Sequence, residues 1–294
     1  MKKVIRITLI ILLALSAGFG VLYTRAEEPV RNVDIASGVS AIDKYQYFSY
    51  GYLEKVTVPA SVQSIGFSAF DGCVSLKDVQ LSEGLVTLDN RSFAKCKSLT
   101  SIEIPDSVLT IGNASFYGCS SLENIKLSGS LTKIDNNLFY QCDSLKNITI
   151  PDSVTQIGQQ SFYGCRGLTS LVLPDNLLRI EDGAFYECKN LEAIEVPSSV
   201  NYIGEDAFLG CDKLTIYCES GSYAQKYAMS NGIKASTGTV LTEDKDMQAA
   251  SENDVPKTGI RKHDWIWFTV MLFAVSGLVL IKRTSRWDQV KMNR

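Results

Sequence analysis

The sequence predicts a solenoid of stacked 23-residue coils, with short parallel strands on one face and little regular helix. Two observations predict it. Cysteine, phenylalanine and leucine each recur every 23 residues without a change of register, and a fixed period of this length is typical of repeat architectures. The end of each repeat, as in Leu99 to Pro105, alternates apolar and polar residues as a short strand does. Stacking would bring these strands side by side in parallel.

The periodic positions form three series that we expect to be three internal columns, because one coil alone cannot bury its apolar face. The cysteines are Cys73, Cys96, Cys119, Cys142, Cys165, Cys188 and Cys211. The phenylalanines are Phe70, Phe93, Phe116, Phe139, Phe162, Phe185 and Phe208. The leucines are Leu76, Leu99, Leu122, Leu145, Leu168, Leu191 and Leu214. Tyr47, Tyr50 and Leu53 lie on the same grid one period earlier, so about eight coils are expected over residues 36–218, after an N-terminal segment of residues 27–35.

A second period of 46 residues runs inside the first. Glycine recurs at Gly66, Gly112, Gly158 and Gly204, whereas the intervening coils carry Asp89, Asp135 and Glu181 at that position. We interpret this alternation as the duplication of a two-coil unit.

The solenoid is expected to end in a cap over residues 219–234. Ser222 to Ser230 predicts a short helix that covers the last coil, and Asn231-Gly232 is a helix stop signal. Residues 235–254 are polar, acidic and poor in large apolar side chains, which predicts a disordered tether.

The N-terminus carries a predicted export signal, and the C-terminus carries a predicted membrane segment. Lys2, Lys3 and Arg6 precede an apolar run, so residues 1–26 predict a secretory signal peptide that is cut after Ala26. Residues 265–281 hold no charge and predict a transmembrane segment. Residues 282–294 begin with basic side chains, which predicts a cytoplasmic tail and places everything upstream outside the cell.

A five-residue motif stands just before the apolar segment: Val255, Pro256, Lys257, Thr258 and Gly259. It resembles the Leu-Pro-x-Thr-Gly sorting signal of Gram-positive wall-anchored proteins, with Val255 in place of the usual leucine and a tail longer than is typical. The resemblance implies that a sortase attacks the carbonyl of Thr258, releases Gly259 and passes the chain to a peptidoglycan precursor. The alternative is a single-pass membrane protein that residues 265–281 retain.

The recurring pattern Phe-x-x-Cys-x-x-Leu-x-x-Ile-x-Ile-Pro resembles the BspA-type leucine-rich repeats of bacterial surface proteins. The resemblance covers about residues 36–218, and Tyr217 to Lys234 is similar to the closing segment of that family. It implies a leucine-rich repeat solenoid with a C-terminal cap, displayed on the cell surface for adhesion or recognition.

The cysteine series is interpreted as a buried column of free thiols, because thiols behave as small apolar side chains. Disulfides between neighbouring coils are the alternative, since export permits them and adjacent strands are close enough. Cys218 lies off the 23-residue grid, and a bridge from Cys211 to Cys218 stays open. Metal binding is disfavoured because no Cys-x-x-Cys pair occurs.

Composition excludes several function classes. The only histidine, His263, lies beyond the expected cleavage point, so the mature chain lacks the nucleophile pairs that need histidine. Its carboxylates form no recognisable glycosidase pair, and we expect no enzyme, no cofactor and no metal site. Residues 27–258 hold eighteen basic and thirty acidic residues, a net charge of −12 that disfavours nucleic acid as a partner.

Binding to an unidentified protein or glycan is the function that remains. Each of four coils has a tyrosine directly after its phenylalanine, namely Tyr117, Tyr140, Tyr163 and Tyr186. If the phenylalanine points inward, its neighbour points outward, and the four rings form a stacked strip able to pack on sugars or protein. The alternative is that each tyrosine seals the edge of its coil and only its hydroxyl is wet.

Overall fold

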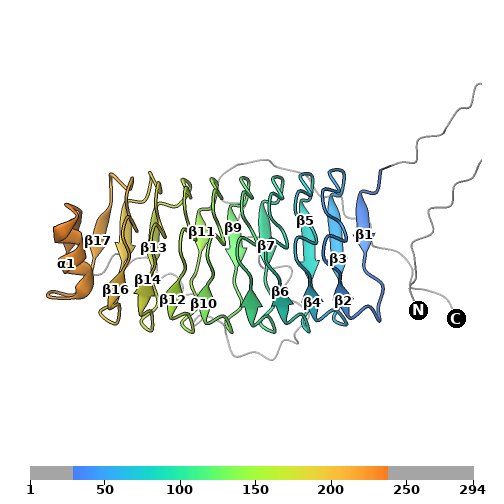
Figure 1. Cartoon of the computed structure of the whole chain (residues 1–294), viewed down its shortest axis with the longest axis horizontal. Coiled ribbons are helices and arrows are strands. Elements are labelled where there is room, and N and C mark those ends of the chain that lie inside the picture. Colours follow the sequence, from blue (N-terminus) through green and yellow to red (C-terminus); the bar gives the residue numbers. More distant parts are fainter. Residues whose placement is uncertain (1–28, 238–294) are drawn as a thin grey trace, which may run out of the picture. The chain divides into compact units, whose positions relative to one another are not determined.

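Each coil contributes one strand to a long row of parallel strands, here called row one. The structure is a computed structural model that describes residues 29–237. Row one consists of β1 (Asn32–Asp34), β3 (Lys55–Val58), β5 (Asp78–Leu81), β7 (Ser101–Glu103), β9 (Asn124–Lys126), β11 (Asn147–Ile148), β13 (Ser170–Val172), β15 (Ala193–Glu195), β17 (Thr215–Tyr217) and β18 (Lys234–Ser236). Paired residues such as Val33 and Val56 are 23 apart. One period is therefore one coil, and the predicted solenoid is confirmed (Figure 1).

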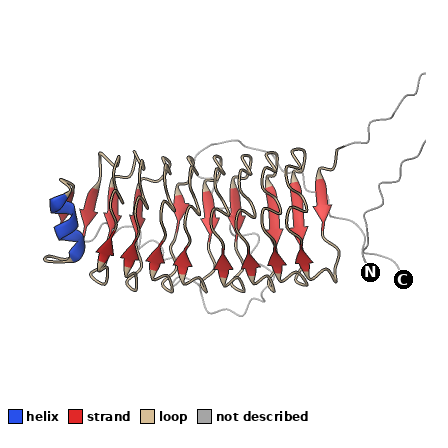
Figure 2. Ribbon diagram, viewed as in Figure 1, coloured by secondary structure: helices blue, strands red, loops and turns tan. Residues whose placement is uncertain are grey.

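A second row of strands, row two, runs along the other face of the coils (Figure 2). It consists of β2 (Ala41–Ile42), β4 (Ser64–Ile65), β6 (Thr87–Leu88), β8 (Thr110–Ile111), β10 (Lys133–Ile134), β12 (Gln156–Ile157), β14 (Arg179–Ile180) and β16 (Tyr202–Ile203). The second residue of each strand is a buried Ile or Leu. The sequence does not predict this row, because a two-residue strand is too short to show alternation.

The strand ladders of the two rows are interrupted at different coils. Row one divides between β5 and β7 and again between β11 and β13, whereas row two divides between β8 and β10. The breaks are staggered, so at least one strand pair joins every two neighbouring coils through the described stack.

The turn that holds the phenylalanine adds a third set of hydrogen bonds between coils. In one coil, the N–H groups of Asn137, Phe139 and Gln141 donate to carbonyls of the next coil at 2.7–2.9 Å. Asn137 and Gln141 have positive φ, 55° and 54°. Two of the three donors therefore adopt the left-handed conformation, and Phe139 between them does not.

The phenylalanines form the predicted central column. Neighbouring rings from Phe70 to Phe208 have centroids 5.1–6.0 Å apart. Tyr47 stacks on the first ring at 5.1 Å, and Tyr227 meets the last ring edge-on at 6.1 Å. The core residues lie between Val33 and Ala235, so the described residues bury a core of their own.

The two ends of the stack correct the expected boundaries. β1 pairs with β3, so the stack begins at Asn32, inside the segment expected to precede the coils. The helix α1 (Tyr223–Ser230) lies as predicted, with the Ser222 hydroxyl accepting from the N–H of Gln225. Beyond it, β18 pairs with β17, so residues 235 and 236 belong to the stack and not to the tether.

The alternating glycines have a steric reason that a duplicated unit does not supply. A Cβ at Gly112 would lie 2.5 Å from Oδ1 and 2.6 Å from the main-chain N of Asn90. Asn90 Oδ1 accepts a hydrogen bond from the N–H of Asn113 at 2.7 Å. An Asx side chain in one coil and a glycine in the next therefore go together, and Asn136 and Asp182 repeat the arrangement.

Candidate functional site

The four tyrosines form a continuous stack. Ring centroids are 4.9 Å apart for Tyr117 and Tyr140, 4.3 Å for Tyr140 and Tyr163, and 5.2 Å for Tyr163 and Tyr186, with planes within 8° of parallel. All four side chains are half-buried. Burial raises the pKa of Tyr140, and the neighbouring Tyr163 and Tyr117 raise it further.

The rings are stacked as predicted, and the stacking limits which parts of the rings a ligand can reach. The faces of Tyr140 and Tyr163 are covered by the rings on either side, so solvent meets ring edges and hydroxyl groups. A sugar packs on an exposed aromatic face, and a row of edges does not provide one. What the strip can offer a ligand is a series of phenol hydroxyls at the spacing of the coils.

Arg91 closes one end of the tyrosine column. Its guanidinium carbon lies 5.6 Å from the centroid of the Tyr117 ring. Its Nη2 lies 2.9 Å from Oδ2 of Asp71, a carboxylate whose side chain is only 6% exposed. Ala94 stands in the tyrosine position of the intervening coil and leaves room for this contact. The sequence does not reveal this ion pair. The 23-residue period shows only that Asp71 and Ala94 hold the position that is tyrosine in the next four coils.

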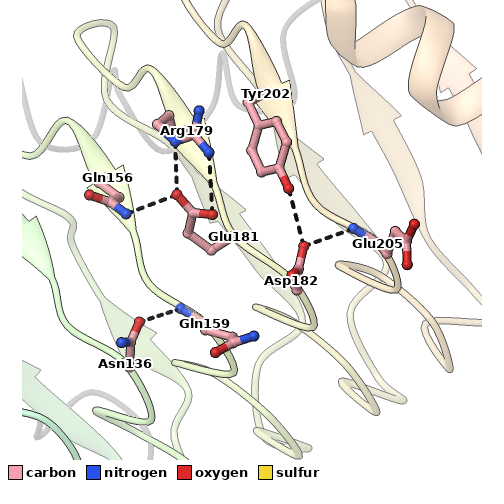
Figure 3. Close-up of polar contacts among 8 residues, drawn as sticks. All are labelled: Asn136, Gln156, Gln159, Arg179, Glu181, Asp182, Tyr202 and Glu205. Carbon is pink, nitrogen blue, oxygen red and sulfur yellow. Dashed lines mark hydrogen bonds and ion pairs between the residues drawn. The ribbon is translucent and has the colours of Figure 1, made fainter.

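A second polar cluster lies along row two in the last coils (Figure 3). Oε1 of Glu181 accepts from Nε of Arg179 and from Nε2 of Gln156, each at 2.8 Å. The Arg179 guanidinium carbon lies 4.0 Å from the centroid of the Tyr202 ring. The Tyr202 hydroxyl donates to Oδ1 of Asp182 at 3.3 Å, and the nearby carboxylate raises the pKa of Tyr202.

Side-chain oxygens of this cluster accept hydrogen bonds from the main chain of the next coil. Asp182 also accepts from the main-chain N–H of Glu205 at 3.1 Å, and Asn136 accepts from that of Gln159 at 2.8 Å. Within residues 29–237, no three His, Cys, Asp or Glu side chains are placed to hold a metal ion. The cluster therefore joins neighbouring coils.

The seven periodic cysteines are buried and free in the described stack. Each thiol donates to the carbonyl of the residue 26 positions earlier, at Sγ–O distances of 3.0–3.3 Å. For six of the seven, that residue is the phenylalanine of the preceding coil. Burial raises the pKa of Cys73 and of Cys119 to about 12. Such thiols stay protonated and unreactive at neutral pH.

Cys218 belongs to a different column. β15 and β17 pair Ile194 with Ile216, a spacing of 22, so the last coil is one residue shorter between its leucine and its strand. Cys218 thereby takes the inward position that Val196 holds one coil earlier, and it is buried and free. The structure contains no Cys211–Cys218 bridge.

The export and anchoring features lie outside the described residues. These are the signal peptide of residues 1–26, the motif Val255 to Gly259, the apolar segment of residues 265–281 and the basic tail of residues 282–294. From Pro29 to Thr237, the only helix is α1, which is too short and too polar to cross a membrane.

Comparison with protein families identifies the repeats. The model of the BspA type leucine-rich repeat region matches residues 40–168 and 132–237. These matches cover more than half of the chain. The protein belongs to the BspA-type leucine-rich repeat family. No curated protein matches the chain.

Solved structures of other leucine-rich repeat proteins are similar to this family member. The T. pallidum leucine-rich repeat protein TpLRR is 26% identical, with a TM-score of 0.47 over 71% of this chain and 86% of that one. A leucine-rich cell surface protein of Faecalibacterium prausnitzii is 25% identical, with a TM-score of 0.39 over 71% and 64%. The pneumococcal vaccine antigen PcpA is 18% identical, with a TM-score of 0.36 over 71% and 79%.

Proposed function

We propose that this BspA-type protein is a non-enzymatic binding module displayed on the bacterial surface for adhesion or recognition. The observation that carries the proposal is the tyrosine column, in which four stacked rings from consecutive coils present their hydroxyls along a rigid stack. Export at the N-terminus and membership of this repeat family support the surface location.

The ligand contact proposed for Tyr117, Tyr140, Tyr163 and Tyr186 is hydrogen bonding to their hydroxyls, because stacking leaves these groups and the ring edges accessible. A protein surface suits such a row, since main-chain and side-chain groups can both donate and accept. Arg91 fixes Tyr117 and so extends the ordered row. The column needs no rearrangement to bind, which lowers the entropy cost of association.

Substitution by phenylalanine tests this contact, because it removes a hydroxyl and leaves the stack. Binding of the ectodomain, residues 27–258, to an array of extracellular-matrix proteins is compared between wild type and the Tyr140→Phe/Tyr163→Phe variant. We expect the matrix-protein signal to fall at least tenfold while the melting temperature stays unchanged. Tyr223→Phe, on the exposed side of α1, is the matched control. An unchanged signal in the double variant contradicts a role for the column.

For attachment, we propose that a sortase cleaves between Thr258 and Gly259 and joins the chain to peptidoglycan. The order of the motif, the apolar segment and the basic tail supports this. Retention in the membrane by residues 265–281 is the second candidate. Deleting the sortase of the producing bacterium separates the two: loss of the protein from the wall-linked fraction supports the first, and an unchanged membrane fraction supports the second. A Thr258→Ala variant should behave like the sortase deletion.

A further inference from the structure

The first coil carries a cluster of exposed aromatic side chains, here called the end patch: Tyr45, Phe48, Tyr50 and Tyr52. Their exposed fractions run from 46% to 64%. Between Pro29 and Thr237, the only other exposed aromatic side chain is that of Tyr223. Four exposed rings in eight residues are a concentration that recognition sites favour and ordinary surfaces do not.

The rings of the end patch differ from the tyrosine column in their orientation. Tyr45 meets Phe48 at 85° and Phe67 at 80°, and Tyr50 meets the buried Tyr47 at 87°. None of the four rings is stacked parallel on another ring of the described chain. Edge-on contacts cover at most part of a ring, so the end patch keeps aromatic faces accessible where the column does not.

The same turn has main-chain acceptors without partners. In the second coil, the carbonyls of Phe67, Ala69 and Asp71 accept from N–H groups of the first coil at 2.8–3.0 Å. The equivalent carbonyls of the first coil belong to Lys44, Gln46 and Phe48. No described coil precedes them, and no donor within residues 29–237 reaches them. The end patch thus combines open ring faces with a row of hydrogen-bond acceptors.

The charge around the end patch and its position in the stack restrict the class of ligand that it can bind. Residues 27–55 hold three basic residues (Arg31, Lys44, Lys55) and five acidic residues (Glu27, Glu28, Asp34, Asp43, Glu54), a net charge of −2 out of the −12 of residues 27–258. The patch lies near β1, and the opposite end of the stack is covered by α1 and β18 (Figure 1).

We propose that the end patch binds a neutral oligosaccharide, an inference that rests on the proposed binding function and names a ligand class for it. Sugar rings present C–H faces that pack on aromatic faces, and hydroxyls that donate to carbonyl oxygens. The turn of the first coil supplies both, and the segment around it carries little net charge for an ionic ligand.

The test uses the ectodomain, residues 27–258, which contains the complete core. Tetrasaccharides of β1,4-linked glucose, β1,4-linked N-acetylglucosamine and α-linked mannose are titrated into it by calorimetry, beside a sialylated tetrasaccharide. We expect at least one neutral probe to bind. The Tyr50→Ser/Tyr52→Ser variant should lose about tenfold or more in affinity, because each aromatic contact contributes on the order of 1 kcal/mol. Tyr223→Ser, exposed on α1, is the matched control and should bind like wild type.

Several results would overturn the inference: no neutral probe binds, only the sialylated probe binds, or the double variant binds as wild type does. A further contradicting result comes from sedimentation velocity. If wild type forms a dimer and the double variant does not, the end patch binds a second copy of this chain and not a sugar. Circular dichroism checks that both variants fold. If matrix proteins bind through Tyr140 and Tyr163 while sugars do not bind, the binding function stands and this inference fails. If neither class binds, both fail.

Discussion

The thiol of Cys142 donates a hydrogen bond to the main-chain carbonyl of Phe116, with 3.1 Å between Sγ and O. The same carbonyl accepts from the N–H of Cys119 within its own coil, also at 3.1 Å. A cysteine at this position therefore fills the core and satisfies the second lone pair of a buried carbonyl. Alanine would fill less space and donate nothing, which explains why the residue returns in seven coils.

We predict that Cys142→Ala lowers the free energy of unfolding by about 1–2 kcal/mol, since it loses a small apolar group and a weak hydrogen bond. Phe139→Ala, in the ring column of the same coil, should cost about 3–5 kcal/mol. Urea unfolding followed by circular dichroism measures both. Thr132→Ala, at an exposed position, is the control and should stay within about 0.5 kcal/mol. Equal losses in all three variants would contradict the columns.

Gly112→Ala should be destabilising by about 1–3 kcal/mol, because the new Cβ meets the main chain of the preceding coil. Gly129→Ala is the matched control: its nearest atom would be 3.7 Å away, at Oδ1 of Asp106. Thermal unfolding of the two variants should separate them clearly. If both cost the same, the alternating glycines reflect duplication alone.

Removing Arg91 should cost more than removing an exposed partner elsewhere. Arg91→Ala leaves the buried carboxylate of Asp71 without its cation, and we expect a loss of about 2–3 kcal/mol. Lys126→Ala removes an ion pair with Glu103 in which the lysine side chain is 66% exposed and the glutamate side chain 68%. This variant should lower the free energy of unfolding by only about 0–1 kcal/mol. A double-mutant cycle with Asp71→Asn measures the coupling. A coupling near zero would show that the ion pair between Arg91 and Asp71 does not stabilise the fold.

Stability should fall at alkaline pH. Burial raises the pKa of Cys73 and Cys119 to about 12, above the value near 9 of an exposed thiol. From about pH 9 to pH 12 the unfolded chain releases these protons while the folded chain keeps them, so the stabilisation present below pH 9 is lost as pH rises. Each such thiol contributes about 1.4 kcal/mol per pH unit at most.

Urea unfolding at pH 7, 9 and 10 measures this slope. Cys73→Ala/Cys119→Ala should be less stable than wild type at pH 7 and should show a shallower decline above pH 9. A slope that the double substitution leaves unchanged would assign the alkaline loss to groups other than these two thiols.

The internal columns could be predicted from the sequence because period and chemistry coincide: Phe139, Cys142 and Leu145 are buried, as their spacing predicts. The first strand and the last strand could not. Asn32–Asp34 carries none of the Phe, Cys and Leu residues of the three columns, and it is the pairing of Val33 with Val56 of β3 that reveals a coil. Row two, such as β8, is too short for alternation to show.

The candidate site was predictable in part. The 23-residue spacing places Tyr117, Tyr140, Tyr163 and Tyr186 in one column, but spacing carries no information on ring orientation, which decides whether faces or edges are accessible. The end patch escaped prediction because no other coil repeats this set of four aromatic residues, although Tyr50 and Phe48 lie at the cysteine and tyrosine positions of the grid. Arg91 was missed because its partner Asp71 lies 20 residues away, off the period.

Thiol accessibility is the most direct measurement of the stack, because all eight cysteines are buried in it. The ectodomain is treated with iodoacetamide at pH 8, with and without urea, and its intact mass is recorded over time. The account predicts fewer than about one label per molecule while the chain is folded, and eight in urea. Rapid labelling of most thiols in the absence of urea would contradict it.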